Sequence, residues 1–246
     1  TTTSMRASWI TSLRMLLPMR MRKNRKKLLL SLRRRKRKAS SADFSAERTR
    51  AMRTKLLFAT NNANKLREAR QILEPMGFEI LSMKDAGVDI EPDETGTTFV
   101  RNAEIKACDV YNELEIRMPV IADDSGLCVD ALGGRPGVYS ARYAPEGERC
   151  QKLLDEMKDV PEGKRSAYFE CAIVYVDKYV CESFTGRCEG TIGYEERGEN
   201  GFGYDPIFLR DGRTLAEMSS EEKNAISHRG AAMEKLVSYL KESYGV

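Results

Sequence analysis

Two adjacent carboxylates and a hydroxyl, in Asp123-Asp124-Ser125-Gly126, directly follow the apolar residues 119–122. An apolar run without polar alternation predicts a strand buried on both faces, and open α/β sheets bind their ligands at the carboxyl ends of such strands. Two adjacent carboxylates repel an anionic ligand unless a cation stands between them, and Mg²⁺ prefers oxygen ligands of this kind. The same residue types favour turns, so this segment predicts either a metal site or a polar turn.

A second candidate is Thr60-Asn61-Asn62, followed by Lys65, at a predicted strand-to-helix turn. The first turn of a helix offers unpaired backbone N–H groups and a partial positive charge, so phosphate binds there readily. Lys65 would add a full positive charge. The alternative is an ordinary asparagine cap beside a solvated lysine.

Two loops contain further candidates. Residues 91–96 are dense in acids and could supply a metal carboxylate from a second segment, although acidic residues are more often simply solvated. Residues 201–206 place Phe202 and Tyr204 among glycines, where either ring could stack on a nucleobase or anchor the loop to the core.

The segment 222–230 contains His228, the only histidine of the chain, next to Arg229. Ser227 is predicted to cap the last helix, which puts both side chains at the helix N-terminus. Cations are unfavourable there unless an anion or a carbonyl meets them. The placement therefore predicts a bound partner, and ordinary surface charge is the alternative.

The elements that must position these residues alternate between strands and helices early in the chain and include a hairpin later. Strands are predicted at residues 55–60, 78–82, 119–122, 127–129, 166–176, 179–188 and 206–209. Helices are predicted from Asn62 or Asn64 to about 74, from about 97, around 150–157 and after Ser227. This order predicts an α/β fold with a mixed sheet flanked by helices.

Charge is distributed unevenly along the 246 residues. Residues 1–51 contain 16 of the 41 Lys and Arg residues but only 2 of the 37 acids, a net charge of +14, and the rest of the chain carries −10. We expect residues 1–53 to be a disordered basic extension, because they lack a pattern that could bury a core. The alternatives are an organelle-targeting segment, a polybasic arm for nucleic acid or lipid, and translated sequence upstream of Met52.

The composition of the remaining chain argues against several classes of function. Its negative charge gives no electrostatic reason to grip nucleic acid along its surface. All six cysteines lie there without a Cys-x-x-Cys pair, which argues against zinc and predicts free thiols in a reducing compartment, so we expect a cytoplasmic location. No apolar run approaches the roughly 20 residues that span a bilayer, so no membrane contact is expected.

In their order and combination, these five segments resemble the inosine/xanthosine triphosphate pyrophosphatases. That family hydrolyses non-standard purine nucleoside triphosphates (ITP, dITP and XTP) to the monophosphate and pyrophosphate. The resemblance covers about residues 55–240 and implies that residues 54–246 form one nucleoside triphosphate pyrophosphatase domain. It also implies an elongated mixed sheet with two lobes around a central active-site cleft, and a homodimer.

The resemblance implies that the strand-to-helix turn at residues 60–65 contacts the phosphates of the substrate. Thr60, Asn62 and Lys65 are expected to bind the triphosphate. Asn61, a further candidate contact, stands where the family commonly has glycine.

At the metal end, the resemblance implies that Glu94 and Asp124 hold Mg²⁺, for which Mn²⁺ could substitute. Asp93 is an alternative to Glu94, because the length of the acidic loop varies in the family. Asp124 is also the expected proton acceptor, and Ser125 is expected to touch the substrate.

At the nucleobase end, the resemblance implies a pocket built from two segments. Its expected members are Phe202, Gly203, Tyr204, Asp205, Lys223, His228 and Arg229. Of these, Arg229 and His228 are the candidates for recognising the purine 6-oxo group, since adenine presents an amino donor there.

These assignments predict attack of water on the α-phosphorus, with Asp124 orienting or deprotonating the water. A less selective phosphatase that releases orthophosphate from the terminal position is a second hypothesis. A nucleic-acid-binding protein that uses the basic arm, with the remaining chain as a scaffold, is a third. The basic arm explains none of the five segments.

Overall fold

The computed structural model describes residues 54–245, which form one seven-stranded sheet with the order β2-β1-β3-β4-β5-β6-β7. The strands are β1 (Thr54–Phe58), β2 (Phe78–Ser82), β3 (Val120–Val129), β4 (Ser166–Val176), β5 (Cys181–Ile192), β6 (Phe208–Arg210) and β7 (Arg213–Thr214). Strand β1 pairs in parallel with β2 and β3, and the other neighbours are antiparallel. The predicted mixed sheet is confirmed.

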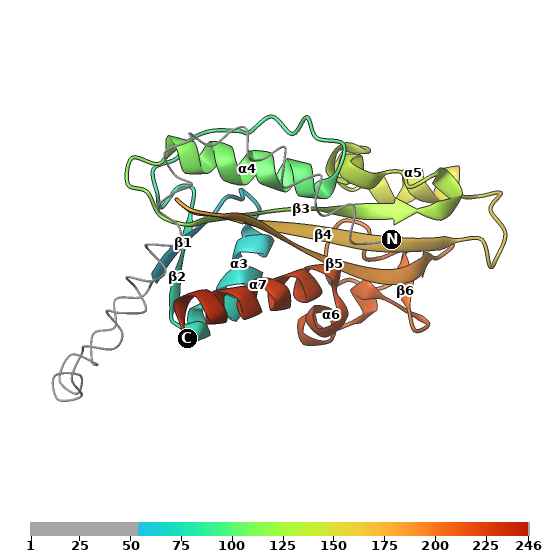
Figure 1. Ribbon diagram of the computed structural model, residues 1–246. Coiled ribbons are helices and arrows are strands. Elements are labelled where there is room, and N and C mark those ends of the chain that lie inside the picture. The colour runs from blue at the N-terminus through green and yellow to red at the C-terminus, as the bar shows by residue number, and fades with distance from the viewer. Residues whose placement is uncertain (1–53, 246) are drawn as a thin grey trace, which may run out of the picture. The chain divides into compact units, whose positions relative to one another are not determined.

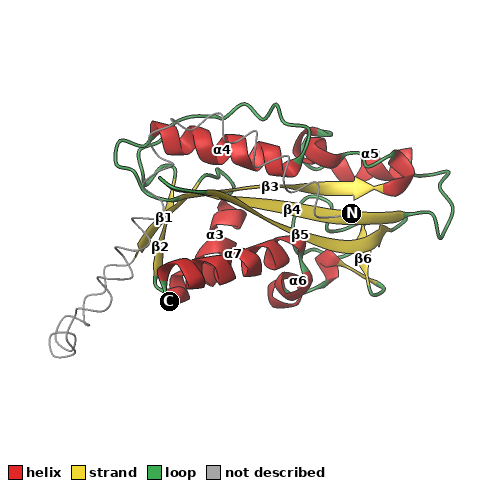
Figure 2. Cartoon of the chain, viewed as in Figure 1, coloured by secondary structure: helices red, strands yellow, loops and turns green. Residues whose placement is uncertain are grey.

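Helices cover both faces of this sheet (Figures 1 and 2). They are α3 (Ala63–Leu73), α4 (Phe99–Glu113), α5 (Arg149–Glu156), α6 (Ser220–Ile226) and α7 (His228–Tyr244). Short 3₁₀ turns lie at Glu74–Met76, Asp130–Leu132, Gly137–Arg142 and Leu215–Glu217. Helix α4 lies along one face of the sheet, and α3 and α7 lie on the other.

Side-chain caps fix where the helices that carry site residues begin. Asn62 accepts hydrogen bonds from the backbone N–H groups of Asn64 and Lys65 at the start of α3. Thr98 accepts one from Arg101 N–H at the start of α4, and Ser227 accepts one from Gly230 N–H at the start of α7. These caps satisfy N–H groups that have no partner within the helix.

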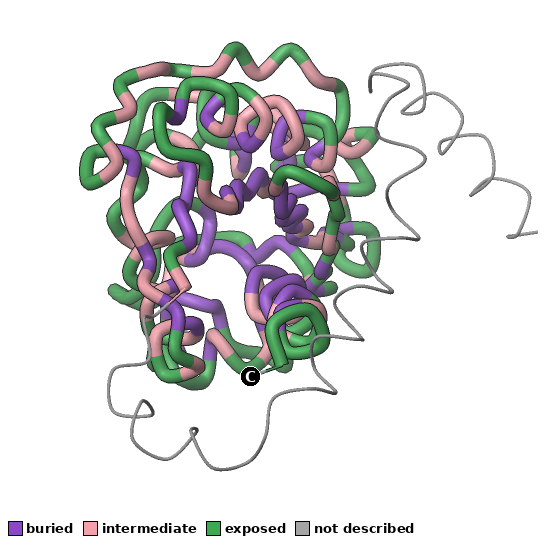
Figure 3. Tube along the Cα trace, turned by 60° about the vertical axis from the view of Figure 1, so that its left-hand side comes forward, coloured by how far each residue is buried: buried purple, intermediate pink, exposed green. Residues whose placement is uncertain are grey.

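The core is divided by the sheet, because successive side chains of a strand point to opposite faces. In β3, Ile121 packs with α3 and α7, whereas Val120 and Ala122 pack with α4. The same alternation in β4 places Ile173 on the α7 face and Ala172 on the α4 face. Figure 3 shows the buried residues running along the central strands, with exposed residues on the outer loops.

Strand β3 differs from its prediction. The apolar run was expected to end at Asp123, with a separate strand at 127–129, but β3 is continuous from Val120 to Val129 and pairs with β4 over all ten residues. The polar residues lie within the strand because β4 supplies backbone partners throughout. The polar-turn alternative is therefore wrong.

Other boundaries shift by a few residues. The carboxylate of Asp177 accepts hydrogen bonds from the N–H groups of Tyr179 and Val180, so β5 begins at Cys181 instead of 179, and it extends to Ile192. Strand β6 begins two residues later than predicted and is followed by β7. The six cysteines are free thiols, as predicted.

Several expectations are not decided by the fold. The predicted disorder of residues 1–53 lies outside the described residues. The two lobes, the cleft and the homodimer stay predictions. Among the helices that the structure describes, none combines the length and the apolar composition needed to cross a membrane.

Candidate active site

The candidate site lies where β1 ends and β3 continues. Strand β1 pairs with β3 only through Leu57 with Val120 and Phe58 with Ile121, and Ala59 N–H adds a hydrogen bond to Ile121 O. The edge of β3 at Asp123 and Ser125 therefore extends past the carboxyl end of a parallel neighbour, which is the position where open α/β sheets bind ligands.

Asp124 faces α4. Its Oδ2 accepts a hydrogen bond from Asn102 Nδ2 at 3.1 Å, and its Oδ1 lies 3.4 Å from Lys106 Nζ. Asn102 is fully buried and also accepts a hydrogen bond from Gly96 N–H at 2.8 Å. Asn102 thus ties the acidic loop to the strand that carries Asp124.

Lys106 joins Asp124 to the acidic loop. Its Nζ lies 3.1 Å from Glu94 Oε1, so one ammonium group serves two carboxylates. Burial raises the pKa of Asp124 above its ordinary value; Lys106 opposes this rise and Glu94 adds to it. Burial lowers the pKa of Lys106, but the carboxylates of Asp124, Asp123 and Glu94 outweigh it and raise the net value, which keeps the ammonium charged.

Asp123 faces α3 and α7. Its Oδ2 lies 2.8 Å from Lys65 Nζ and 3.5 Å from Arg229 Nε, and only 1% of its side chain is exposed. Burial alone would raise the pKa of Asp123, but Lys65, Arg229 and Lys106 lower it to about 2. Arg229 also pairs with Glu68 of α3.

The predicted phosphate turn has the geometry of a helix start. Thr60 Oγ1 accepts a hydrogen bond from Asn62 N–H at 3.2 Å, and Asn62 caps α3. Asn61 is exposed and does not adopt a positive φ, so glycine is not required there. Lys65 is not the solvated lysine of the alternative interpretation, because it pairs with Asp123.

The donor set around Lys106 suits a hard divalent cation. The carboxylates of Glu94 and Asp124 both pair with the Lys106 ammonium group, whereas Asp93 is exposed. No group of three or more potential metal-ligating His, Cys, Asp or Glu side chains occurs within residues 54–245. Two carboxylates with the remaining positions left to substrate phosphates and water are the usual environment of Mg²⁺, so the residues present fit this ion.

The loop Gly201–Asp205 separates its two aromatic rings. Phe202 is 37% exposed, and Lys223 Nζ lies 4.5 Å and the Arg229 guanidinium carbon 5.8 Å from the centroid of its ring. Tyr204 is instead buried, and its hydroxyl donates a hydrogen bond to Ser140 O at 2.9 Å. The structure thus makes Tyr204 a core anchor and leaves Phe202 as the ring available for stacking.

The other loop residues hold this arrangement. Asp205 is buried and accepts hydrogen bonds from Phe202 N–H and from Lys223 Nζ, both at 2.7 Å. Gly203 has a φ of +66°, which favours glycine, and its carbonyl accepts a hydrogen bond from Cys150 Sγ. Lys223 is therefore fixed between Asp205 and the Phe202 ring.

His228 is a buried neutral imidazole stacked on Phe169, with ring centroids 4.9 Å apart and planes at 13°. Burial, then the charges of Arg229 and Lys223, hold the pKa of His228 well below its ordinary value. The sequence argument assumed two unmet cations at this helix start, and that premise is wrong; the alternative of ordinary surface charge is also wrong, because both side chains are buried. His228 is uncharged, and Glu68 and Asp123 already meet Arg229. The bound partner stays a prediction.

Sequence reasoning missed Asn102, Lys106 and Glu68. A signal existed for the first two, because Asn102 and Lys106 lie three and seven residues after Phe99 and so continue the face marked by Phe99, Ala103 and Ala107. Polar residues on an inward face indicate buried polar partners. Glu68 gave no comparable signal, since its partner Arg229 is 161 residues away.

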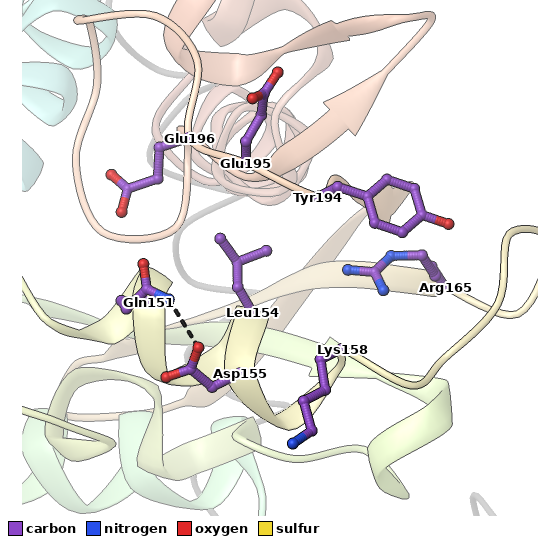
Figure 4. Close-up of a pocket in the computed structure, with 8 residues that line it drawn as sticks. All are labelled: Gln151, Leu154, Asp155, Lys158, Arg165, Tyr194, Glu195 and Glu196. Carbon is purple, nitrogen blue, oxygen red and sulfur yellow. Dashed lines mark hydrogen bonds between the residues drawn. The ribbon is translucent and has the colours of Figure 1, made fainter.

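A pocket outside this site has a volume of about 500 Å³. It is lined by Gln151, Leu154, Asp155, Lys158, Arg165, Tyr194, Glu195 and Glu196 (Figure 4). The Arg165 guanidinium donates to the carbonyls of Met157, Val160, Ile192 and Gly193. This buried cation is satisfied internally, and none of the residues predicted for chemistry lines the pocket.

Comparison with known proteins identifies the family. A model of the Ham1 family matches residues 56–239. The chain belongs to the Ham1 family. Ham1 relatives include a dITP/XTP pyrophosphatase of Escherichia coli K12, 45% identical over 199 residues (76% of this chain, 98% of the relative). Another is a dITP/XTP pyrophosphatase of Bacillus subtilis, 46% identical over 193 residues (75% of this chain, 96% of the relative).

Solved Ham1 structures have the same fold. A HAM1 protein from Coxiella burnetii is 40% identical with a TM-score of 0.71, and covers 77% of this chain and 99% of its own. The Ham1 protein of Staphylococcus aureus is 36% identical with a TM-score of 0.70, and covers 77% of this chain and 100% of its own. The family resemblance and the α/β fold predicted from the sequence are confirmed.

Proposed function

We propose that this chain hydrolyses non-standard purine nucleoside triphosphates, namely ITP, dITP and XTP, to the monophosphate and pyrophosphate. One observation supports this most strongly. Two consecutive residues of β3 present carboxylates to opposite faces of the sheet, one with Lys106 and Glu94 and the other with Lys65 and Arg229. One strand edge thus borders both a metal-type acidic cluster and a cationic cluster. The names of the Ham1 relatives agree with this proposal.

The phosphates would be received by the first turn of α3 and by Lys65, with Thr60 and Asn62 shaping the turn. Mg²⁺ or Mn²⁺ held by Glu94 and Asp124 would neutralise charge on the triphosphate. Asp124 orients or deprotonates the water that attacks the α-phosphorus. Ser125, the next residue of β3, points to the opposite face of the sheet, the face of Asp123, where the phosphates would lie near Lys65. Such transfers require positioning and charge neutralisation more than covalent catalysis.

Base recognition would use the cluster around Arg229. Its Nη1 pairs with Glu68 and its Nε faces Asp123, and among residues 54–245 no partner occupies Nη2, which can donate to a purine 6-oxo group. Phe202 offers a stacking surface. Adenine would place an amino donor against this donor, and an unpaired buried donor costs about 1–3 kcal/mol.

A nucleotide panel tests this function. The chain is incubated with Mg²⁺ and ITP, dITP, XTP, GTP or ATP, and pyrophosphate and orthophosphate are measured separately. We expect pyrophosphate from the first three and little turnover of ATP, with activity lost in excess chelator. Orthophosphate as the only product would instead support a terminal phosphatase, and full activity in chelator would refute the metal assignment.

A further inference from the structure

Asp123 shares one carboxylate oxygen between cations from two helices. Lys65 lies in the first turn of α3 and Arg229 in the first turn of α7, and both approach Oδ2. In the function proposed above, Lys65 meets the phosphates and Arg229 meets the base. Asp123 is therefore the residue that connects the two ends of one bound nucleotide.

The pairing is shielded from water. The exposed fractions of the Lys65, Asp123 and Arg229 side chains are 16%, 1% and 7%. Charges interact more strongly in such an environment than at the surface. If the shared anion is removed, two cations are left facing each other with their charge uncompensated, so at least one must move.

The two cations do not depend on Asp123 equally. Arg229 has a second carboxylate partner in Glu68, whereas Asp123 is the single carboxylate paired with Lys65 among the described residues. Both oxygens of Asp123 and Nε of Arg229 are buried without a hydrogen-bond partner among the described residues, so charge attraction holds Asp123 between Lys65 and Arg229. Arg229 therefore keeps a carboxylate partner when Lys65 is altered, whereas Lys65 has none when Asp123 is removed.

We propose that Asp123 is a positioning residue that holds Lys65 and Arg229 in register, so that the triphosphate and the base of one substrate are recognised together. This inference rests on the proposed function. Asp123 acts through the two cations, in contrast to Asp124, which meets the reacting groups.

The test compares Asp123→Asn with two matched variants that each alter one end. Binding of inorganic tripolyphosphate reports the phosphate end, and the preference for inosine over adenosine monophosphate reports the base end. Lys65→Met should weaken only the binding of tripolyphosphate, and Glu68→Gln should reduce only the preference for inosine monophosphate. Asp123→Asn should weaken both, lowering tripolyphosphate affinity by about 10- to 100-fold, because Lys65 is no longer held where its charge-assisted contact with the phosphates forms. Tighter tripolyphosphate binding would overturn the proposal.

The kinetic constants for ITP separate a positioning role from a purely structural one. Asp123→Asn should raise KM for ITP more than it lowers kcat, both measured per folded molecule. If only one end changes, or if folded protein keeps both affinities, the proposal is overturned. Should Asp123→Asn fail to fold, Asp123→Glu keeps the charge and moves it by one methylene group, and unchanged binding at either end of that variant would overturn the proposal.

Failure of the proposed function would look different. If the unaltered chain binds both probes and the variants follow the expected pattern, but no pyrophosphate is released from ITP, then the proposed function fails and the positioning role stands. If the unaltered chain binds neither probe, both are overturned.

Discussion

Asp123 and Asp124 are neighbours in the chain, yet their environments are opposite. Asp123 lies on the α3 and α7 face between two cations that lower its pKa to about 2, whereas burial and Glu94 raise the pKa of Asp124 on the α4 face. The difference follows from strand geometry, because consecutive side chains point to opposite faces. One strand edge can therefore present a permanently charged anchor and a carboxylate suited to accept a proton.

The substitution that should reduce activity most is at Asp124, on the α4 face. Asp124→Asn removes the proposed proton acceptor and metal ligand, and we expect kcat for ITP to fall by about 10²- to 10⁴-fold. Binding of inosine monophosphate should change by less than about threefold, since the groups assigned to the base lie on the other face. Steady-state kinetics and calorimetry measure the two effects. Turnover near the original rate would remove Asp124 from the catalytic role.

A second change tests the cation of the same face. Lys106→Met leaves Glu94 and Asp124 without their shared ammonium group, and we expect kcat/KM for ITP to fall by about 100-fold. Arg101→Ala is the matched control, because Arg101 lies on the same helix, is largely exposed and pairs only with Glu104 among the described residues. Equal losses in both variants would show that Lys106 has no special role.

The opposite face can be disturbed through the backbone. Gly186 of β5 lies against α7, and a Cβ added there would be 2.1 Å from His228 O and 2.5 Å from Ala232 N. Gly186→Ala must therefore displace the first turn of α7. We expect about a 10-fold loss of preference for ITP over ATP, with a smaller change in kcat.

The control for Gly186→Ala is Gly163→Ala. Gly163 has a φ of +81° and nothing within 4 Å of an added Cβ, so this substitution strains the backbone without a steric clash. It should lower stability while leaving the base preference unchanged. A change of preference in both variants would mean that destabilisation alone alters specificity.

Some parts of the site could be predicted from local signals in the sequence. The caps Asn62 and Ser227 are local signals and correctly placed the starts of α3 and α7. The sequence analysis assigned chemistry to Asp124. It did not predict that Asp123 and Asp124 face opposite sides of the sheet, because β3 was expected to end where β4 in fact keeps it extended.

Contacts between residues far apart in the sequence could not be predicted. Lys106 continues the inward face of α4, but its partners depend on α4 packing against the face of β3 that carries Asp124, which no local pattern predicts. The pair formed by Arg229 and Glu68 joins segments 161 residues apart, and no local pattern encodes such a distance. The sequence thus predicts elements and chemical types, whereas the topology decides which charges meet.

The last prediction concerns Asp123, on the α7 face, and its effect on the free energy of unfolding at low pH. The folded pKa of Asp123, about 2, lies below its ordinary value of 3.8, so Asp123 contributes stability above pH 3.8 that is lost as pH falls toward 2. The full difference corresponds to about 2 kcal/mol, of which about 1 kcal/mol should be lost by pH 3. Urea unfolding of the unaltered chain and of Asp123→Asn between pH 6 and pH 3 measures it. The gap in unfolding free energy between the two proteins should narrow only below about pH 4, and a gap that stays constant to pH 3 would contradict the ion pairing of Asp123 with Lys65 and Arg229.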